Sequence, residues 1–170
     1  MLFQQLERVV IECDRRALAS KVIRGDEEYL RSHYPGYPIV PGIVVLDAIA
    51  QSGAFLVHIV TSKRVGKQML PILAMIESVK FLQAVKPGQR LHVKTEIADT
   101  GTGAVGVDGA AEVDGAVVVT ARLIYTIVEM AETVMGLEAR DLKALRDYWN
   151  GMCADVRRAE DSRAINNRIT

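Results

Sequence analysis

The sequence predicts an α+β protein in which an antiparallel sheet encloses one long buried helix. Residues 43–61 are apolar on nearly every side, as expected of a helix surrounded by other structure. Around this stretch lie short runs rich in apolar and β-branched residues, separated by turn signals such as Asp114-Gly115. The chain has 170 residues, of which 49% are hydrophobic, so it can form one domain with a proper core.

The strands are predicted from these runs in chain order. The first two, at 8–14 and 17–24, are joined by a turn, and Asp26 is a candidate cap for one helical turn after them. Residues 90–99 alternate between apolar and polar side chains, which is typical of a strand with one buried face. Further strands are expected at 69–80, 105–113 and 116–128.

The last forty residues differ in character from the rest. Within 136–158, apolar residues that include Leu137, Leu142 and Trp149 recur at roughly helical intervals. After this stretch the chain is mostly polar. We therefore predict a domain at 1–130 and a helical C-terminal extension at 131–170.

Composition argues against several classes of function. Lys+Arg and Asp+Glu are both 21, so no global charge favours nucleic acid. Residues 39–60 are apolar, but Asp47 would then lie within a bilayer at a cost of a few kcal/mol, so we expect a buried helix and no membrane span. Cys13 and Cys153 form no Cys-x-x-Cys pair and the N-terminus lacks secretory features, which favours free thiols and a cytoplasmic protein.

The segment before the long helix contains three prolines. They fall at Pro35, Pro38 and Pro41 within residues 32–42. Proline fixes φ and removes a backbone donor, so we expect an ordered, rigid loop instead of a helix or a central strand. Such a loop is a costly connection unless it holds something in place, and it carries His33.

Three residues around this loop offer acid–base chemistry. His33 supplies an imidazole, and Asp47 places a carboxylate in an otherwise apolar helix, where burial is expected to shift its pKa. Gly42 lies at the N-terminus of that helix, where free N–H groups and the helix dipole favour negative charge. These are the parts needed to remove a proton α to a carbonyl and expel a β-hydroxyl.

The same residues carry a family resemblance. The segment SHYPGYPIVPGIVVLDAIAQ resembles the signature of the β-hydroxyacyl-[acyl-carrier-protein] dehydratases of the FabZ/FabA type, with an acidic residue, Asp47, fourteen positions after His33. Downstream, IESVKFLQAVKPGQRLHVKTEI is similar to the family's strand, Pro-Gly turn and next strand. The resemblance extends over about 6–128.

The resemblance implies a hotdog fold, in which a curved antiparallel sheet wraps a long central helix. It also implies a homodimer whose two sheets join, with His33 of one chain facing Asp47 of its partner. The backbone N–H at Gly42, beside Ile43, would bind the thioester carbonyl, and the acyl chain would lie in a tunnel along the helix. Acyl carrier protein is the implied partner, the substrate is carried on its phosphopantetheine, and no metal or redox cofactor is expected.

Several positions depart from the family pattern. Ser32 replaces the usual glycine, and Tyr34 replaces the usual phenylalanine. The acidic residue is Asp47, as in the FabA branch, whereas FabZ members carry Glu. FabA members can also isomerise the double bond, and one residue does not decide that activity. The pathway, fatty acid or polyketide-type synthesis, therefore stays open. The oligomeric state also stays open, with a higher oligomer or a heterodimer as alternatives to the homodimer.

The remaining polar and aromatic residues are weaker candidates. Gln51 is expected to bond the loop or the other helix, and Tyr34, Tyr37 and Phe81 either pack or line the tunnel. His58 is read as a satisfied structural histidine and His92 as exposed. The basic residues Lys63, Arg64 and Lys67 form either a solvated turn or a docking site for the acidic carrier protein. Two other functions stay open: a hotdog acyl thioesterase and a non-catalytic acyl-binding or heterodimer subunit.

Overall fold

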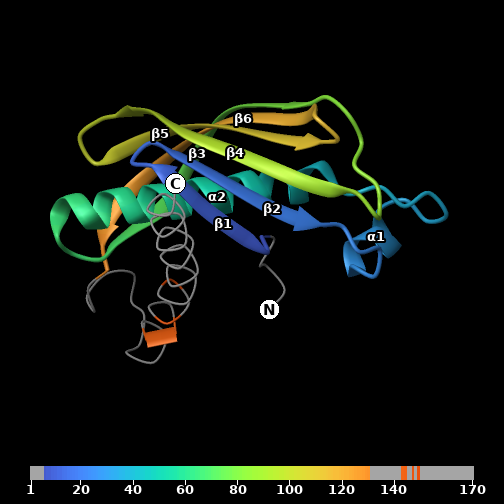
Figure 1. The fold of residues 1–170 in the computed structure, drawn as a ribbon, viewed down its shortest axis with the longest axis horizontal. Coiled ribbons are helices and arrows are strands. Elements are labelled where there is room, and N and C mark those ends of the chain that lie inside the picture. Colours follow the sequence, from blue (N-terminus) through green and yellow to red (C-terminus); the bar gives the residue numbers. More distant parts are fainter. Residues whose placement is uncertain (1–5, 131–142, 145–146, 148, 150–170) are drawn as a thin grey trace, which may run out of the picture.

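The computed structural model describes residues 6–130 together with 143, 144, 147 and 149. In this part of the chain a six-stranded antiparallel sheet in the order β1-β2-β4-β5-β6-β3 packs against one long helix, α2 (Figure 1). The elements are β1 (Arg8–Cys13), β2 (Arg16–Val22), α1 (Glu28–His33), α2 (Gly42–Val65), β3 (Met69–Phe81), β4 (Arg90–Thr100), β5 (Ala104–Val113) and β6 (Ala116–Glu129). The predicted fold class is confirmed.

The helix α2 lies unusually close to the middle of the sheet. A Cβ at Gly109 of β5 would come within 2.2 Å of the Ile49 side chain, so only glycine allows this contact. A Cβ at Gly53 would likewise come within 2.8 Å of the Tyr125 hydroxyl, which donates a hydrogen bond to the Ala50 carbonyl at 2.7 Å. These contacts fix the position and rotation of α2, and with them the direction of every side chain on it.

The alternation predicted for the fourth strand is confirmed in β4. Leu91, Val93 and Ile97 are buried beneath α2, whereas His92 and its polar alternates face outward. The hairpin between β5 and β6 turns at Asp114-Gly115, whose φ values of 52° and 81° match the paired left-handed residues of a tight hairpin turn. This turn sets the register that brings the inward side chains of β6 over the helix.

The strand β3 forms one edge of the sheet and carries an exposed apolar surface. It pairs with β6 on one side only, and two register shifts interrupt the pairing near Met75. Leu73 is 41% exposed, Met75 52%, Ile76 43% and Phe81 54%. An unpaired, apolar edge of this length is a template for pairing with another strand.

Two local predictions around α1 are wrong. Glu27, not Asp26, precedes the helix, and its carboxylate accepts backbone hydrogen bonds from Arg24 and Gly25, while Asp26 pairs with the Arg24 side chain. The loop was also expected to contain no helix, yet α1 continues through His33. The helix can continue because the first proline, which disfavours helix in the residue before it, comes only at Pro35.

By length and composition alone α2 could cross a membrane, with a mean hydropathy of 1.9 over its most apolar window. Of that window, 56% is buried within the molecule, where one side of the helix packs on the sheet. The burial fits the predicted core helix. The C-terminal extension predicted at 131–170 lies outside the described residues except for positions 143, 144, 147 and 149, as does Cys153, whereas Cys13 is exposed and free.

Candidate active site

A cleft of about 640 Å³ lies beside the N-terminus of α2. It forms because the Val40 N–H donates to the Val85 carbonyl at 2.8 Å, which ties the proline-rich loop to the segment that follows β3. The cleft brings together five residues predicted from the sequence: His33, Tyr34, Gly42, Ile43 and Phe81. Its other lining residues, which the sequence did not single out, are Ile39, Val40, Val45, Leu82, Gln83, Ala84, Val85 and Val119.

His33 presents an accessible imidazole to this cleft. It is the last residue of α1, and its ring contacts the edge of Tyr34, with centroids 4.6 Å apart and planes at 74°. The proline-rich loop follows immediately and restricts the backbone on that side. His33 is therefore held by both flanking elements while its ring stays open to a substrate.

Gly42 gives the cleft a site for negative charge. It opens α2 after Pro41, and the first-turn N–H groups of a helix have no acceptor within the helix. The ring of Phe81 packs so closely that a Cβ at position 42 would come within 2.7 Å of it. Glycine therefore leaves the helix N-terminus open to a carbonyl oxygen that acquires charge, while Phe81 covers one side of it.

Asp47 lies further along α2 and does not line this cleft. Its carboxylate is half-buried and accepts a hydrogen bond from the Gln51 amide at 2.8 Å. Burial raises the pKa of Asp47, and the Gln51 hydrogen bond offsets only part of that rise. Gln51 thus bonds Asp47 along the same helix. His33 lines the cleft and Asp47 does not, so the two side chains do not meet at this cleft within one chain.

The raised pKa of Asp47 predicts a pH-dependent cost to stability. The folded state keeps this proton to higher pH than the unfolded chain, whose aspartates titrate near 3.9. Stability is therefore lost as pH rises through the folded-state pKa. We expect Asp47→Asn to increase the free energy of unfolding at pH 7, with the gain shrinking as pH falls toward the unfolded value.

Urea unfolding of the wild type and of Asp47→Asn across pH measures this difference. Glu12→Gln is the matched control, because Glu12 is an exposed carboxylate on β1. A gain in stability that is equal for both variants, or that is independent of pH, would contradict a pKa of Asp47 raised by burial.

One residue of this region was missed by the sequence reading. Tyr125 is 1% exposed, and its hydroxyl bonds the helix backbone one turn after Asp47. Burial, together with the nearby charge of Asp47, raises the pKa of the Tyr125 phenol. Strand alternation could have identified Tyr125, because position 125 lies on the same inward face of β6 as the buried Leu123.

Of the weaker candidates, Tyr34 and Phe81 line the cleft, whereas Tyr37, His58 and the basic residues around the C-terminus of α2 do not. Tyr37 is exposed, and its ring packs under the Lys86 ammonium at 5.8 Å. His58 is buried and its Nδ1 lies 2.6 Å from the Met69 carbonyl, as expected of a structural histidine. Lys63 and Lys67 pair with Asp14 and Glu129. Among the described residues, no three His, Cys, Asp or Glu side chains gather to hold a metal.

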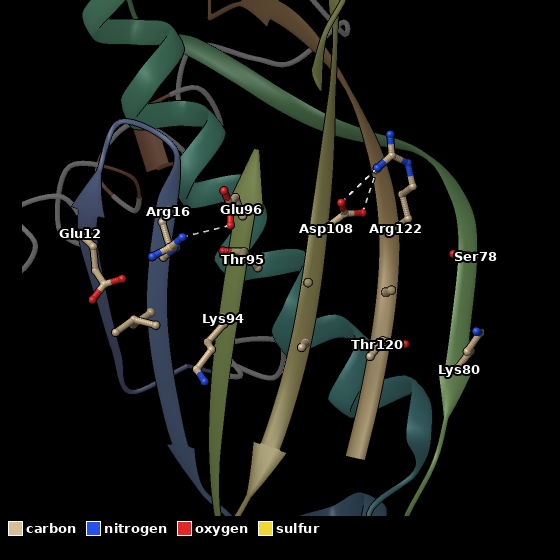
Figure 2. A pocket seen from close by; sticks show the side chains of 14 residues that line it. Glu12, Arg16, Ser78, Lys80, Lys94, Thr95, Glu96, Asp108, Thr120 and Arg122 are labelled. Atoms are coloured by element: carbon tan, nitrogen blue, oxygen red, sulfur yellow. Dashed lines mark hydrogen bonds and ion pairs between the residues drawn. The ribbon is translucent and has the colours of Figure 1, made fainter. Parts of the chain in front are cut away.

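A larger hollow of about 760 Å³ lies on the face of the sheet turned away from α2. Figure 2 shows it crossed by ion pairs between neighbouring strands, including Arg16 with Glu96 and Arg122 with Asp108. These side chains satisfy one another, and His33, Gly42 and Asp47 are all absent from its lining. The smaller cleft is therefore the candidate active site.

Comparison with known sequences identifies the family. The model of the FabA-like domain matches residues 1–122. A protein from Bacillus licheniformis named 3-hydroxyacyl-[acyl-carrier-protein] dehydratase FabZ is 35% identical over 132 residues, which cover 76% of this chain and 89% of that protein. Its namesake from Bacillus subtilis is 34% identical over 129 residues, 75% of this chain and 89% of that protein.

Comparison with solved structures agrees on the fold. A hypothetical thioesterase from Streptococcus pneumoniae TIGR4, solved with coenzyme A, aligns with a TM-score of 0.57 at 18% identity, covering 75% of this chain and 94% of that one. A chain of the dehydratase heterocomplex ApeI:P from Xenorhabdus doucetiae aligns with a TM-score of 0.54 at 16% identity, covering 71% and 96%. Identities this low establish the shared hotdog architecture alone.

Proposed function

The chain belongs to the FabA-like family, and we propose that it is a 3-hydroxyacyl-[acyl-carrier-protein] dehydratase. This lyase converts a (3R)-hydroxyacyl thioester into the trans-2-enoyl thioester and water. The observation that carries the proposal is the cleft in which the His33 imidazole and the open helix N-terminus at Gly42 come together. The relatives that bear the dehydratase name cover about three quarters of this chain, which supports the same reaction.

The proposed reaction uses each group in its own role. Neutral His33 takes the proton from C2, while the N–H at Gly42 stabilises the charge that develops on the thioester oxygen. The electron pair of the former C2–H bond then forms the C2=C3 double bond as the C3–O bond breaks. Protonated Asp47 donates its proton to the departing hydroxyl, which leaves as water. The raised pKa of Asp47 supports this role, because it keeps a proton available at higher pH than an ordinary aspartate. Solvent exchange returns both groups to their starting states.

We propose further that the working site is formed between two copies of the chain. His33 lines the cleft and Asp47 does not, so the two meet only if a partner supplies one of them. The exposed apolar edge at β3 is the surface by which two sheets would pair, and Phe81 at its end borders the cleft. Pairing at this edge would therefore bring the partner close to His33.

A charge on the β3 edge tests this dimer. Ile76→Lys would bury an unpaired ammonium at the proposed contact, at a cost of several kcal/mol. We expect the variant to sediment as a folded monomer and to lose turnover. Val65→Lys, at another exposed apolar residue at the end of α2, should stay dimeric and active. A dimeric, active Ile76→Lys variant would show that β3 does not form the interface.

The partner, cofactor and location follow from the proposed reaction. We propose that acyl carrier protein delivers the substrate on its phosphopantetheine arm, and that the reaction needs no metal or redox cofactor. The natural compartment for such a carrier-dependent enzyme is the cytoplasm. Relatives named for carrier-linked substrates support acyl carrier protein as the partner.

One assay separates the reaction classes. Crotonyl and 3-hydroxybutyryl thioesters are offered on carrier protein and on pantetheine, and enoyl absorbance is followed together with free thiol. Reversible interconversion of the two acyl groups without thiol release is the expected result. Thiol release would indicate a thioesterase, and no change with either carrier would indicate a non-catalytic acyl-binding subunit; both outcomes overturn the proposal.

A further inference from the structure

The phenol of Tyr125 lies in the core between β6 and α2. At 1% exposed, Tyr125 is the largest fully buried side chain in the described part of the chain. A phenylalanine would fill this space without a hydroxyl, which costs free energy to remove from water unless it finds an acceptor. The acceptor is the Ala50 carbonyl, at 2.7 Å. The hydroxyl therefore adds a specific bond to the helix, beyond the packing that the ring supplies.

Glycine at position 53 lets the hydroxyl reach this carbonyl, because a Cβ there would come within 2.8 Å of the Tyr125 oxygen. In a helix such as α2 the Ala50 carbonyl also accepts the N–H of Ala54, so Tyr125 supplies a second donor to it. The peptide unit that joins Ala50 to Gln51 is planar and moves as one body. The bond from β6 therefore fixes the backbone from which the Gln51 side chain extends.

Gln51 connects this peptide unit to the proposed acid. Its side-chain amide donates to Oδ2 of Asp47 at 2.8 Å. In the protonated acid, the oxygen that accepts this bond is the carbonyl oxygen, so the acidic proton is carried by Oδ1. The position of Gln51 therefore determines which oxygen of Asp47 holds the proton. Burial and the Gln51 bond set the pKa of Asp47, and Tyr125 is the titratable side chain that reaches this turn from β6.

Resting on the proposed function, we propose that Tyr125 is a positioning residue for Asp47. Its hydroxyl holds the Ala50–Gln51 peptide unit, and thereby the Gln51 amide, so that Asp47 presents its protonated oxygen to the leaving hydroxyl. Because Tyr125 is buried, it does not itself contact the substrate, and its role is carried by the two hydrogen bonds. A phenylalanine at this position would keep the core packed but would release the peptide unit.

The first test measures the pKa of Asp47 directly and needs no turnover. The NMR resonance of its carboxyl carbon, assigned by its absence in Asp47→Asn, is followed across pH in the wild type and in Tyr125→Phe. The Gln51 bond lowers the pKa of Asp47, so loosening this bond should raise the pKa further. Gln51→Leu should raise it as well. Adding Tyr125→Phe to Gln51→Leu should raise it no more, because both changes act through one bond.

The second test measures the reaction. Tyr125→Phe is expected to lower kcat for dehydration of 3-hydroxybutyryl-pantetheine by about two- to tenfold, the value of one hydrogen bond, with KM unchanged. The alkaline limb of kcat, which reports the loss of the Asp47 proton, should move to higher pH. Gly53→Ala should reproduce both effects, because the added methyl group would displace the hydroxyl while the tyrosine itself is kept.

Ile97→Val is the matched control for a loss of stability. It removes one buried methyl group from β4 and should leave the pKa of Asp47 and the pH profile of kcat unchanged. An unshifted pKa of Asp47 or a wild-type kcat in folded Tyr125→Phe would overturn the inference, as would an equal shift in the Gln51→Leu background. If Tyr125→Phe does not fold, the same measurements on Gly53→Ala decide. A wild type without dehydratase activity would overturn the proposed function, whereas the carboxyl resonance would still show whether Tyr125 positions Asp47.

Discussion

Replacing His33 with alanine should lower kcat by about 10²- to 10⁴-fold, the usual value of positioned acid–base catalysis. The imidazole is the only base that lines the cleft together with the helix N-terminus at Gly42 in the part of the chain described here. The side chain is exposed and makes its ring contact with Tyr34 alone among the described aromatic residues, so its removal should leave the fold intact. Hydration of crotonyl-pantetheine, followed by loss of enoyl absorbance, measures the effect.

His92→Ala is the matched control for this experiment. His92 is an exposed histidine on the outer side of β4, and its loss should leave kcat unchanged. Equal thermal midpoints for wild type and both variants would show that stability is not the cause. Near-wild-type turnover by a folded His33→Ala variant would exclude His33 as the base, and the proposed mechanism with it.

The fold was predictable because its periodic signals were strong. An all-round apolar run of helical length and six runs rich in apolar and β-branched residues, one of them alternating, identified α2 and the sheet to within a few residues. The residue that precedes α1 was not, because Asp26 and Glu27 are both acidic and the sequence does not say which carboxylate accepts the backbone N–H groups of Arg24 and Gly25. The register shifts in β3 also leave no simple periodic signal in the sequence.

The site was predictable in its parts but not in its arrangement. Motif spacing identified His33, Gly42 and Asp47, yet a linear sequence does not say which side of α2 faces the cleft. That direction depends on Gly109 and Gly53, which let the helix approach the sheet and so fix its rotation. The stacking of the Trp149 indole on the His58 ring was likewise unpredictable, since the two residues are more than ninety positions apart in the sequence.

Mixing two inactive variants should restore activity if the site is shared between subunits. In a heterodimer of His33→Ala and Asp47→Asn chains, one of the two sites combines the intact His33 of one chain with the intact Asp47 of the other. We expect the heterodimer, purified through a different tag on each chain, to have about half the activity of the wild-type dimer, because a twofold dimer has two equivalent sites. Each parent homodimer should be inactive.

A second heterodimer is expected to give the opposite result. When one chain is wild type and the other carries both substitutions, every shared site lacks one of the two groups, so the shared arrangement predicts no activity. A site contained within one chain would instead leave this heterodimer about half active and the first one inactive. The two preparations therefore decide between the arrangements by which of them turns over substrate. The separation of Asp47 from the His33 cleft within one chain favours the first.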